Sequence, residues 1–94
     1  MREIPIEAEI TDEVPQGEVL TAYDERHLVT YLRLLDAETA GADWREVVRV
    51  VLKLDPVREP ERAHRIWLGH LARARWMSEH GYRHLLAERR NGVA

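Results

Sequence analysis

Three absences narrow the classes of protein to which this chain can belong. It contains no cysteine, which excludes disulfides and thiolate metal sites and fits a reducing compartment. It also lacks any run of about 20 apolar residues, the length that a membrane-spanning helix needs. Its first residues do not form the apolar stretch of a signal peptide. We therefore expect a cytoplasmic protein.

Residues that carry out catalysis are equally scarce. The chain has one serine, Ser78, and one lysine, Lys53, whereas nucleophilic catalysis needs an activated side chain beside a base. His80 and His84 have the i, i+4 spacing that can present two imidazoles to one metal ion. However, Gly81 between them is expected to break the helix, and no third ligand accompanies them. We predict that the chain is not an enzyme and that it has no metal site and no cofactor.

The charge is distributed unevenly along the chain. The net charge is −3, yet residues 1–25 hold eight acidic residues and one arginine, while residues 26–94 hold nine acidic and thirteen basic residues. This asymmetry is compatible with binding nucleic acid, with binding a protein, or with pairing of the acidic part and the basic body. Apolar and polar residues alternate from Ile4 to Ile10, as in a short edge strand. We expect residues 1–23 to form a flexible acidic arm that is partly extended or disordered.

Helical periodicity predicts an all-α fold for the remainder of the chain. Apolar residues recur at the spacing of one helical face in four segments, residues 24–40, 43–54, 61–78 and 82–89. Asp24 and Asp43 are placed to cap the first two helices, and Gly41 to end the first one in the left-handed conformation. We therefore expect a compact four-helix domain over residues 24–89 and a frayed tail over residues 90–94.

The second and third predicted helices are joined by a proline-flanked turn over residues 55–60. A short helix, a turn and a longer helix that carries arginines form the outline of a helix-turn-helix. The usual turn has about 3–4 residues, so this one indicates an extended-turn version. Within the longer helix, His70 lies on the apolar face, where we expect a core histidine bonded to a carbonyl. Gly69 in mid-helix indicates a close approach to its backbone.

Arginines in and near the longer helix raise the possibility of DNA binding, because they could neutralise phosphates. They are Arg58, Arg62, Arg65, Arg73 and Arg75. The chain is acidic overall, however, with an isoelectric point near 5.9, whereas DNA-binding domains more often have values above about 9. Glu59, Glu61 and Glu79 also bracket the helix. We therefore predict against DNA binding and keep a small helix-turn-helix DNA-binding regulator as the alternative.

A protein interface is the competing interpretation of the same helix. Leu68 and Trp76 lie outside its core stripe, and Arg65 and Arg75 flank them. Tryptophan and arginine are enriched at the hot spots of protein interfaces. The opposing interpretation is that the predicted fourth helix covers both apolar side chains. On the first interpretation, these four residues form the partner-binding site of a monomer.

Two parts of the sequence resemble a proteobacterial domain long catalogued as being of unknown function. They are the run Leu32-Arg33-Leu34-Leu35-Asp36-Ala37 with Trp44-Arg45-Glu46-Val47, and residues 72–86 with their Gly81-Tyr82-Arg83-x-Leu85-Leu86 element. The resemblance implies an extended-turn helix-turn-helix. Some members of that family are DNA-binding parts of transcriptional activators, and others are stand-alone antiactivators.

The chain is similar to the short, acidic QseM-like antiactivators of rhizobial symbiosis islands. The resemblance implies that it binds and inhibits a transcriptional activator of the excision and transfer of an integrative and conjugative element. It also implies binding to a LuxR/TraR-type quorum-sensing regulator. We therefore predict an antiactivator that acts by protein–protein contact. An accessory interaction module, such as a member of a toxin–antitoxin pair, is a further alternative.

Overall fold

The computed structural model describes residues 9–81, which contain four α-helices and one short π-helix. The elements are α1 (Ala22–Arg26), α2 (Leu28–Thr39), α3 (Trp44–Val50), α4 (Pro60–Trp76) and η1 (Met77–Gly81). These residues include no strand, so the prediction of an all-α fold is confirmed. The predicted fourth helix and tail, together with most of the predicted edge strand, lie outside the described residues.

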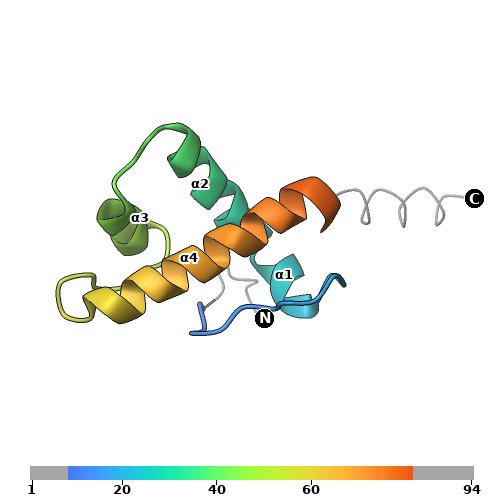
Figure 1. The fold of residues 1–94 in the computed structure, drawn as a ribbon, viewed down its shortest axis with the longest axis horizontal. Coiled ribbons are helices and arrows are strands. Elements are labelled where there is room, and N and C mark those ends of the chain that lie inside the picture. The colour runs from blue at the N-terminus through green and yellow to red at the C-terminus, as the bar shows by residue number, and fades with distance from the viewer. Residues whose placement is uncertain (1–8, 82–94) are drawn as a thin grey trace, which may run out of the picture.

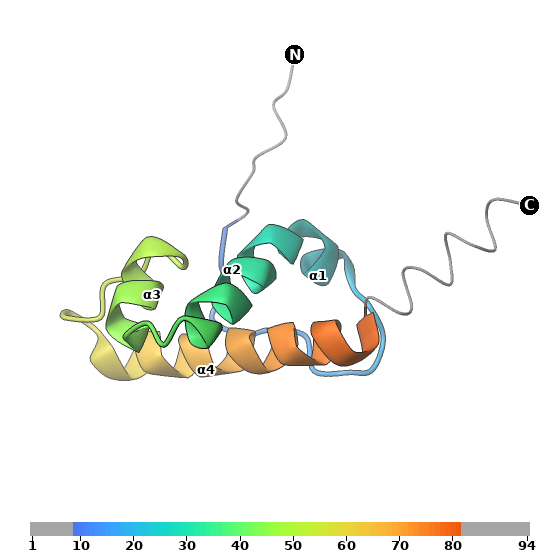
Figure 2. The same cartoon turned by 90° about the horizontal axis from the view of Figure 1, so that it is seen from above.

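The longest helix, α4, is the element on which the others pack. Figure 2 shows α1, α2 and α3 on one side of it. Residues 9–20 contain no helix: Ile10 packs against the core that α2 and α3 share, and the segment then runs along α4 (Figure 1). There the Val14 side chain approaches Gly69, so that a Cβ added to the glycine would lie 3.5 Å from Val14 Cγ1. The N-terminal segment is therefore part of the fold from residue 9 onward.

The first predicted helix is two helices in the structure. Thr21, and not Asp24 as predicted, is the N-cap of α1. The Thr21 hydroxyl accepts a hydrogen bond from the Asp24 N–H, and the Asp24 carboxylate accepts one from the Thr21 N–H, which completes a capping box. His27 then interrupts the helix with φ −113° and ψ 21°. Its imidazole nitrogens lie 2.7 Å from the carbonyl oxygen of Tyr23 and 3.0 Å from that of Glu9, so the break also holds the N-terminal segment.

The next helix boundaries follow the sequence more closely. Asp43 caps α3 as predicted, because its carboxylate accepts from the Arg45 N–H at 3.0 Å. Gly41 is left-handed as predicted, with φ 73°. α3 ends earlier than predicted, ahead of Lys53, whose φ of 60° is not helical. The hydrophobic stripe of the sequence continues past the helix because the residues after it still pack into the core.

The extended-turn helix-turn-helix consists of α3, the connection over residues 51–59 and α4. Asp55 orders this connection, since its carboxylate accepts hydrogen bonds from the N–H groups of Val57 at 2.9 Å and Arg58 at 3.2 Å. Pro60 then opens α4, at a position where a helix leaves the N–H unbonded in any case. The turn predicted from the two prolines is confirmed.

The core occupies the inner side of α4. Its larger cluster joins α2 and the helix-turn-helix through Leu34, Val47, Val48, Leu52, Ala63, Ile66 and Leu71. Its smaller cluster consists of Tyr31, Ala74 and Met77. On the other side of the helix, Arg65 and Leu68 are exposed. Among the helices of residues 9–81, none combines the length and the apolarity that crossing a bilayer requires.

Candidate nucleic-acid interface

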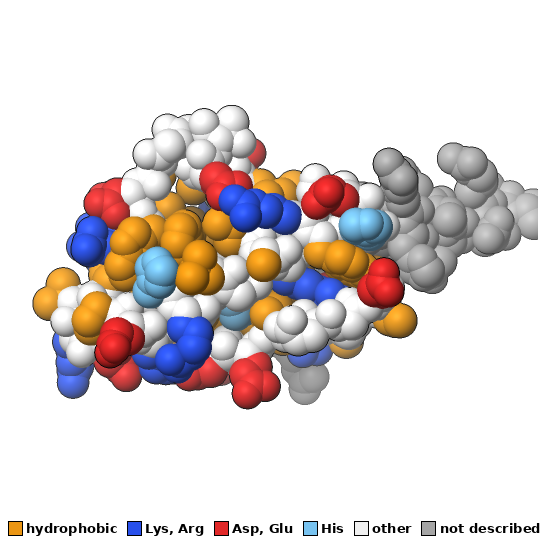
Figure 3. All heavy atoms as spheres, in the orientation of Figure 1, with side chains coloured by type: hydrophobic (Ala, Val, Ile, Leu, Met, Phe, Trp, Pro, Cys, Tyr) orange, Lys and Arg blue, Asp and Glu red, His pale blue; other side chains and the backbone are white. Residues whose placement is uncertain are grey.

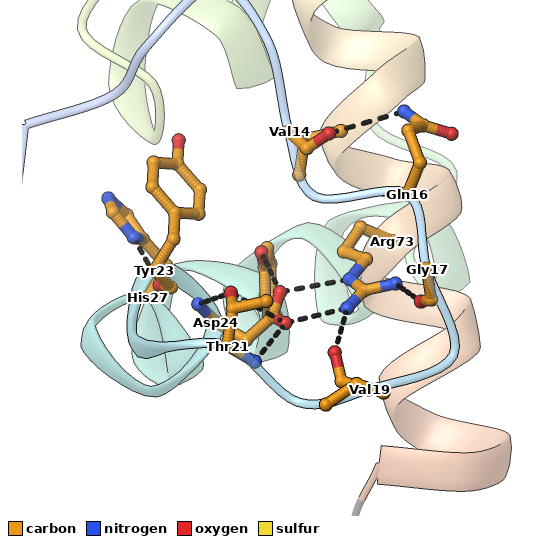
Figure 4. Close-up of polar contacts among 10 residues, drawn as sticks. Val14, Gln16, Gly17, Val19, Thr21, Tyr23, Asp24, His27 and Arg73 are labelled. Carbon is orange, nitrogen blue, oxygen red and sulfur yellow. Dashed lines mark hydrogen bonds and ion pairs between the residues drawn. The ribbon is translucent and has the colours of Figure 1, made fainter.

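A buried ion pair ties the N-terminal segment and α1 to α4 (Figure 4). Arg73 donates to both carboxylate oxygens of Asp24, from Nε at 2.9 Å and from Nη2 at 2.7 Å. It also donates to the carbonyl oxygens of Gly17 at 2.5 Å and Val19 at 3.0 Å. The side chains of the pair are 0% and 3% exposed, so Arg73 is not available to a partner. Its inclusion among the candidate phosphate contacts is therefore wrong.

Hydrogen bonds keep the Asp24 carboxyl group ionised. Burial by itself would raise its pKa, but the bonds from Arg73, Thr21 and Tyr31 together outweigh burial and lower that pKa to about 2. Burial, together with the bond to Asp24, raises the pKa of the Tyr31 hydroxyl above its usual value. The charges in this network are thus satisfied within the protein, and the network has a structural role.

His70 is a core residue, as predicted. Its Nδ1 lies 2.8 Å from the carbonyl oxygen of Ile66, and because a carbonyl only accepts, Nδ1 carries the proton. Nε2 is then free to accept from the Tyr23 hydroxyl at 2.6 Å. Burial lowers the pKa of His70, which agrees with a neutral ring. Residues 9–81 hold no group of three side chains arranged to bind a metal ion, and His84 lies outside that range.

The remaining arginines of α4 differ in what they can still bind. Arg62 donates to both carboxylate oxygens of Asp12, at 2.7 and 2.6 Å. Arg75 pairs with Glu38 of α2, with its Nε 3.2 Å from Oε1. Arg65 is exposed and has no ion pair with any residue in the range 9–81. Of the α4 arginines, Arg65 therefore has the charge that is most available to a partner.

The side of α4 that faces solvent forms one continuous surface from the first turn onward. Its members are exposed or half-exposed and recur at helical spacing, and we call them the α4 face: Glu61, His64, Arg65, Leu68 and Ala72. A shallow hollow lies between the first four of these and Pro60. Leu68 leaves 47% of its surface exposed. The α4 face thus combines an available cation with an apolar side chain.

Aromatic side chains connect the α4 face to α3. Trp44, the first residue of α3, meets His64 edge-on, with ring centroids 4.7 Å apart, and lies 6.0 Å from the ring of Trp67. The guanidinium carbon of Arg45 lies 5.1 Å from the Trp44 ring centroid. Figure 3 shows the resulting apolar patch over α3 and the N-terminal half of α4, with charged side chains around it. The two helices of the helix-turn-helix therefore present one joint surface.

The four residues predicted to bind a protein lie along one side of α4 at helical spacing, but their contacts differ. Arg65 and Leu68 line the same hollow on the α4 face. Arg75 is tied to α2 through its ion pair. Trp76 is half-buried near the N-terminal segment, and the Arg73 guanidinium lies 3.9 Å from its ring centroid. The structure thus places two of the four residues in one hollow, and whether any of them binds a protein stays untested.

Sequence reasoning missed Trp44, Arg45 and His64 as surface residues of the site. Trp44 falls on the apolar side of the helix predicted over residues 43–54, and in the structure it is half-buried and packs against the core. The spacing of apolar residues within α3 does not show which residue of α4 the Trp44 side chain will contact. The i, i+3 pair of His64 and Trp67 was the available signal, because two aromatic rings at that spacing share one side of a helix.

Residues 6–87 match a family model named for the RovC DNA-binding domain and described as "T6SS, Transcription factor, DNA binding domain". The chain belongs to this family. Its matched region includes the whole helix-turn-helix and the α4 face. A comparison with curated proteins finds no match.

Membership of the RovC DNA-binding domain family corrects the functional prediction. The family consists of DNA-binding domains of transcription factors, so the predicted antiactivator identity is wrong, and so is the prediction against DNA binding. The match favours the alternative, a small DNA-binding regulator. It supports transcription regulation and a non-enzymatic class, and it gives no support to quorum sensing, symbiosis islands or conjugative transfer.

The error came from using the charge of the whole chain as a guide to one surface. Three acidic residues and three arginines are paired with each other, Asp12 with Arg62, Asp24 with Arg73 and Glu38 with Arg75, so these charges cancel locally and the net charge does not show where the unpaired charges lie. A DNA molecule responds to the charges within about a Debye length, which is about 8 Å at physiological salt. The sum over all residues therefore says little about the surroundings of Arg65.

Proposed function

We propose that this chain is the DNA-binding module of a transcription regulator and that it places the N-terminal half of α4 in the major groove. The family assignment supports DNA binding. The observation that supports this particular helix is the exposed α4 face, with Arg65 available at its centre. The predicted cytoplasmic location fits this role, and it stays a prediction, as do the domain boundaries at residues 23 and 89.

The dimensions of α4 suit this placement. It has 17 residues, which corresponds to a length of about 25 Å, and the major groove is about 12 Å wide and admits an α-helix. The core lies on the inner side of α4, and Glu61, Arg65 and Leu68 on its other side are exposed, so these side chains can face a groove. In a helix-turn-helix, the first helix crosses the DNA backbone while the second lies in the groove. Here α3 is the first helix.

Individual side chains of this surface match the chemistry of base edges and phosphates. Arginine makes bidentate contacts to guanine, and glutamate accepts from cytosine N4, which are the roles we assign to Arg65 and Glu61. Leu68 suits apolar contact with a thymine methyl group. Arg58 is exposed in the connection just before α4, where it can contact a phosphate.

The test is a binding measurement with a matched control. The full chain first selects its sites from short duplexes with a randomised centre, and the enriched duplex is then titrated by fluorescence anisotropy at physiological salt. Arg65→Ala should weaken binding by about 1–3 kcal/mol, the value of one arginine–guanine pair. Arg26→Ala makes the same change on α1, where the arginine is exposed, and should bind nearly as the wild type does.

Two results would overturn the proposal. The first is the absence of any duplex binding, sequence-selective or not, even at low salt, where phosphate contacts are strongest. The second is an equal loss of affinity in Arg65→Ala and Arg26→Ala, because this would attribute binding to overall charge and not to the α4 face.

A further inference from the structure

The N-terminal segment places acidic residues at the edge of the α4 face. Asp12 is bonded to Arg62, which lies in the first turn of α4. Asp12 and Glu13 line a hollow together with Arg65. Through these contacts, acidic residues of the N-terminal segment lie next to α4, the helix that we propose to bind DNA.

The contact between Asp12 and Arg62 has the geometry of arginine on an oxyanion. Arg62 donates from Nε to Oδ2 at 2.7 Å and from Nη2 to Oδ1 at 2.6 Å, and its Nη1 reaches Glu59 Oε2 at 3.2 Å. Arginine binds phosphate oxygens with the same bidentate fork. The hydrogen bond raises the pKa of Arg62 and lowers that of Asp12, so both groups are charged at neutral pH.

We propose that Arg62 is a phosphate-contact residue and that Asp12 occupies its guanidinium in the DNA-free protein, as an internal substitute for the phosphate. This inference rests on the proposed function. A DNA backbone strand that follows the α4 face on this side would approach the carboxylates of Asp12 and Glu13. Like charges repel, so docking is favoured when Asp12 leaves Arg62 and a phosphate takes its place.

The surroundings of the pair allow such an exchange. The Arg62 and Asp12 side chains are 38% and 48% exposed, and exposed ion pairs of this kind are weak in water. The next anchors of the segment are separate from it: Val14 lies against Gly69, and Arg73 holds the segment further along. Release of Asp12 is therefore a local change that leaves the fold intact.

The inference is tested with substitutions that remove a charge and keep the shape. Asp12→Asn removes the carboxylate that holds Arg62, and Glu13→Gln removes an equal charge from the neighbouring residue, which has no ion pair with the residues of the range 9–81. Anisotropy titrations use the enriched duplex over a range of salt concentrations. Asp12→Asn should tighten binding about two- to fivefold, the range that an exposed ion pair represents, and Glu13→Gln by clearly less.

A double substitution identifies Arg62 as the residue through which Asp12 acts. Arg62→Ala should weaken DNA binding. When Asp12→Asn is added to Arg62→Ala, the affinity should rise by no more than it does in Glu13→Gln. Arg62→Ala should make the slope of log affinity against log salt shallower by about one, since it removes one phosphate contact, whereas Asp12→Asn keeps that contact and should leave the slope nearly unchanged. Thermal unfolding followed by circular dichroism checks that each variant keeps the fold.

The outcomes separate this inference from the proposed function. The inference is overturned if Asp12→Asn and Glu13→Gln raise the affinity for DNA equally. It is also overturned if Asp12→Asn raises the affinity as much in the Arg62→Ala variant as in the wild type. In either case the proposed function still stands if Arg65→Ala weakens binding. If the wild type ignores DNA at every salt concentration, the proposed function and the inference fail together.

Discussion

Replacement of Asp24 by alanine is the perturbation that tests how this domain is held together. Its carboxylate accepts hydrogen bonds from Arg73, Tyr31 and Thr21 and is fully buried. Its removal leaves the Arg73 guanidinium charged and 3% exposed, without its counter-ion. We expect the N-terminal segment, α1 and α4 to lose their common anchor.

The magnitude follows from the burial of the pair. Removing one partner of a buried ion pair costs about 3–5 kcal/mol, because the other charge stays desolvated. The substitution also removes the Asp24 half of the capping box, while the Thr21 hydroxyl keeps its bond from the N–H of residue 24. Small domains have total stabilities of about 5–15 kcal/mol, so Asp24→Ala should remove a large part of the free energy of unfolding. Arg73→Met added to Asp24→Ala should cost little more, since it removes the unpaired charge.

Urea denaturation at neutral pH, followed by circular dichroism and tryptophan fluorescence, measures this change. Asp36→Ala is the matched control, because Asp36 is exposed on α2 and surface substitutions usually change stability by less than about 0.5 kcal/mol. A loss of less than about 1 kcal/mol in Asp24→Ala would refute the role given to the pair. Additive losses in Asp24→Ala and Arg73→Met would also refute it, since residues in one network couple.

Two further predictions concern stability. The pKa of Asp24 is about 2 in the folded protein and 3.8 without its partners. The ionised carboxylate therefore contributes fully to stability above about pH 5, and this contribution, about 2–3 kcal/mol, is lost as the pH falls from about 4 toward 2. The difference in unfolding free energy between the wild type and Asp24→Asn should shrink over that range, and a constant difference would argue against the assignment. Gly69→Ala should raise the stability by up to about 1 kcal/mol, because alanine favours the helix and the added Cβ lies at an ordinary 3.5 Å from Val14. A lower melting temperature in this variant would show that Val14 cannot adjust.

Local patterns in the sequence were enough for much of the fold. The spacing of apolar residues predicted the helices, and Asp43 and Gly41 marked boundaries that the structure confirms. These signals act within a few residues, so a single sequence contains them in full. The break at His27 was not predictable in the same way, because its partners include the Glu9 carbonyl, which only the folded N-terminal segment brings near.

The candidate site was harder to predict, because its residues are defined by contacts far apart in the chain. From the sequence, Asp24 is expected to cap a helix and Arg73 to lie on the surface of a basic helix. In the structure both side chains are buried and form an ion pair. The pairing of Arg62 with Asp12 also joins distant segments. The wrong conclusion about DNA came from the net charge and the isoelectric point of the whole chain, which do not show where on the surface each charge lies.

The central claim is that the outer side of α4 is the surface that meets DNA, and chemical-shift mapping tests it most directly. The isotope-labelled full chain is titrated with the enriched duplex, and the changes are assigned to residues. The largest changes should fall on residues 60–72 and on the first turn of α3 around Arg45. Changes concentrated on the outer side of α2, where Val29 and Leu32 are exposed, with residues 60–72 unaffected, would contradict the claim.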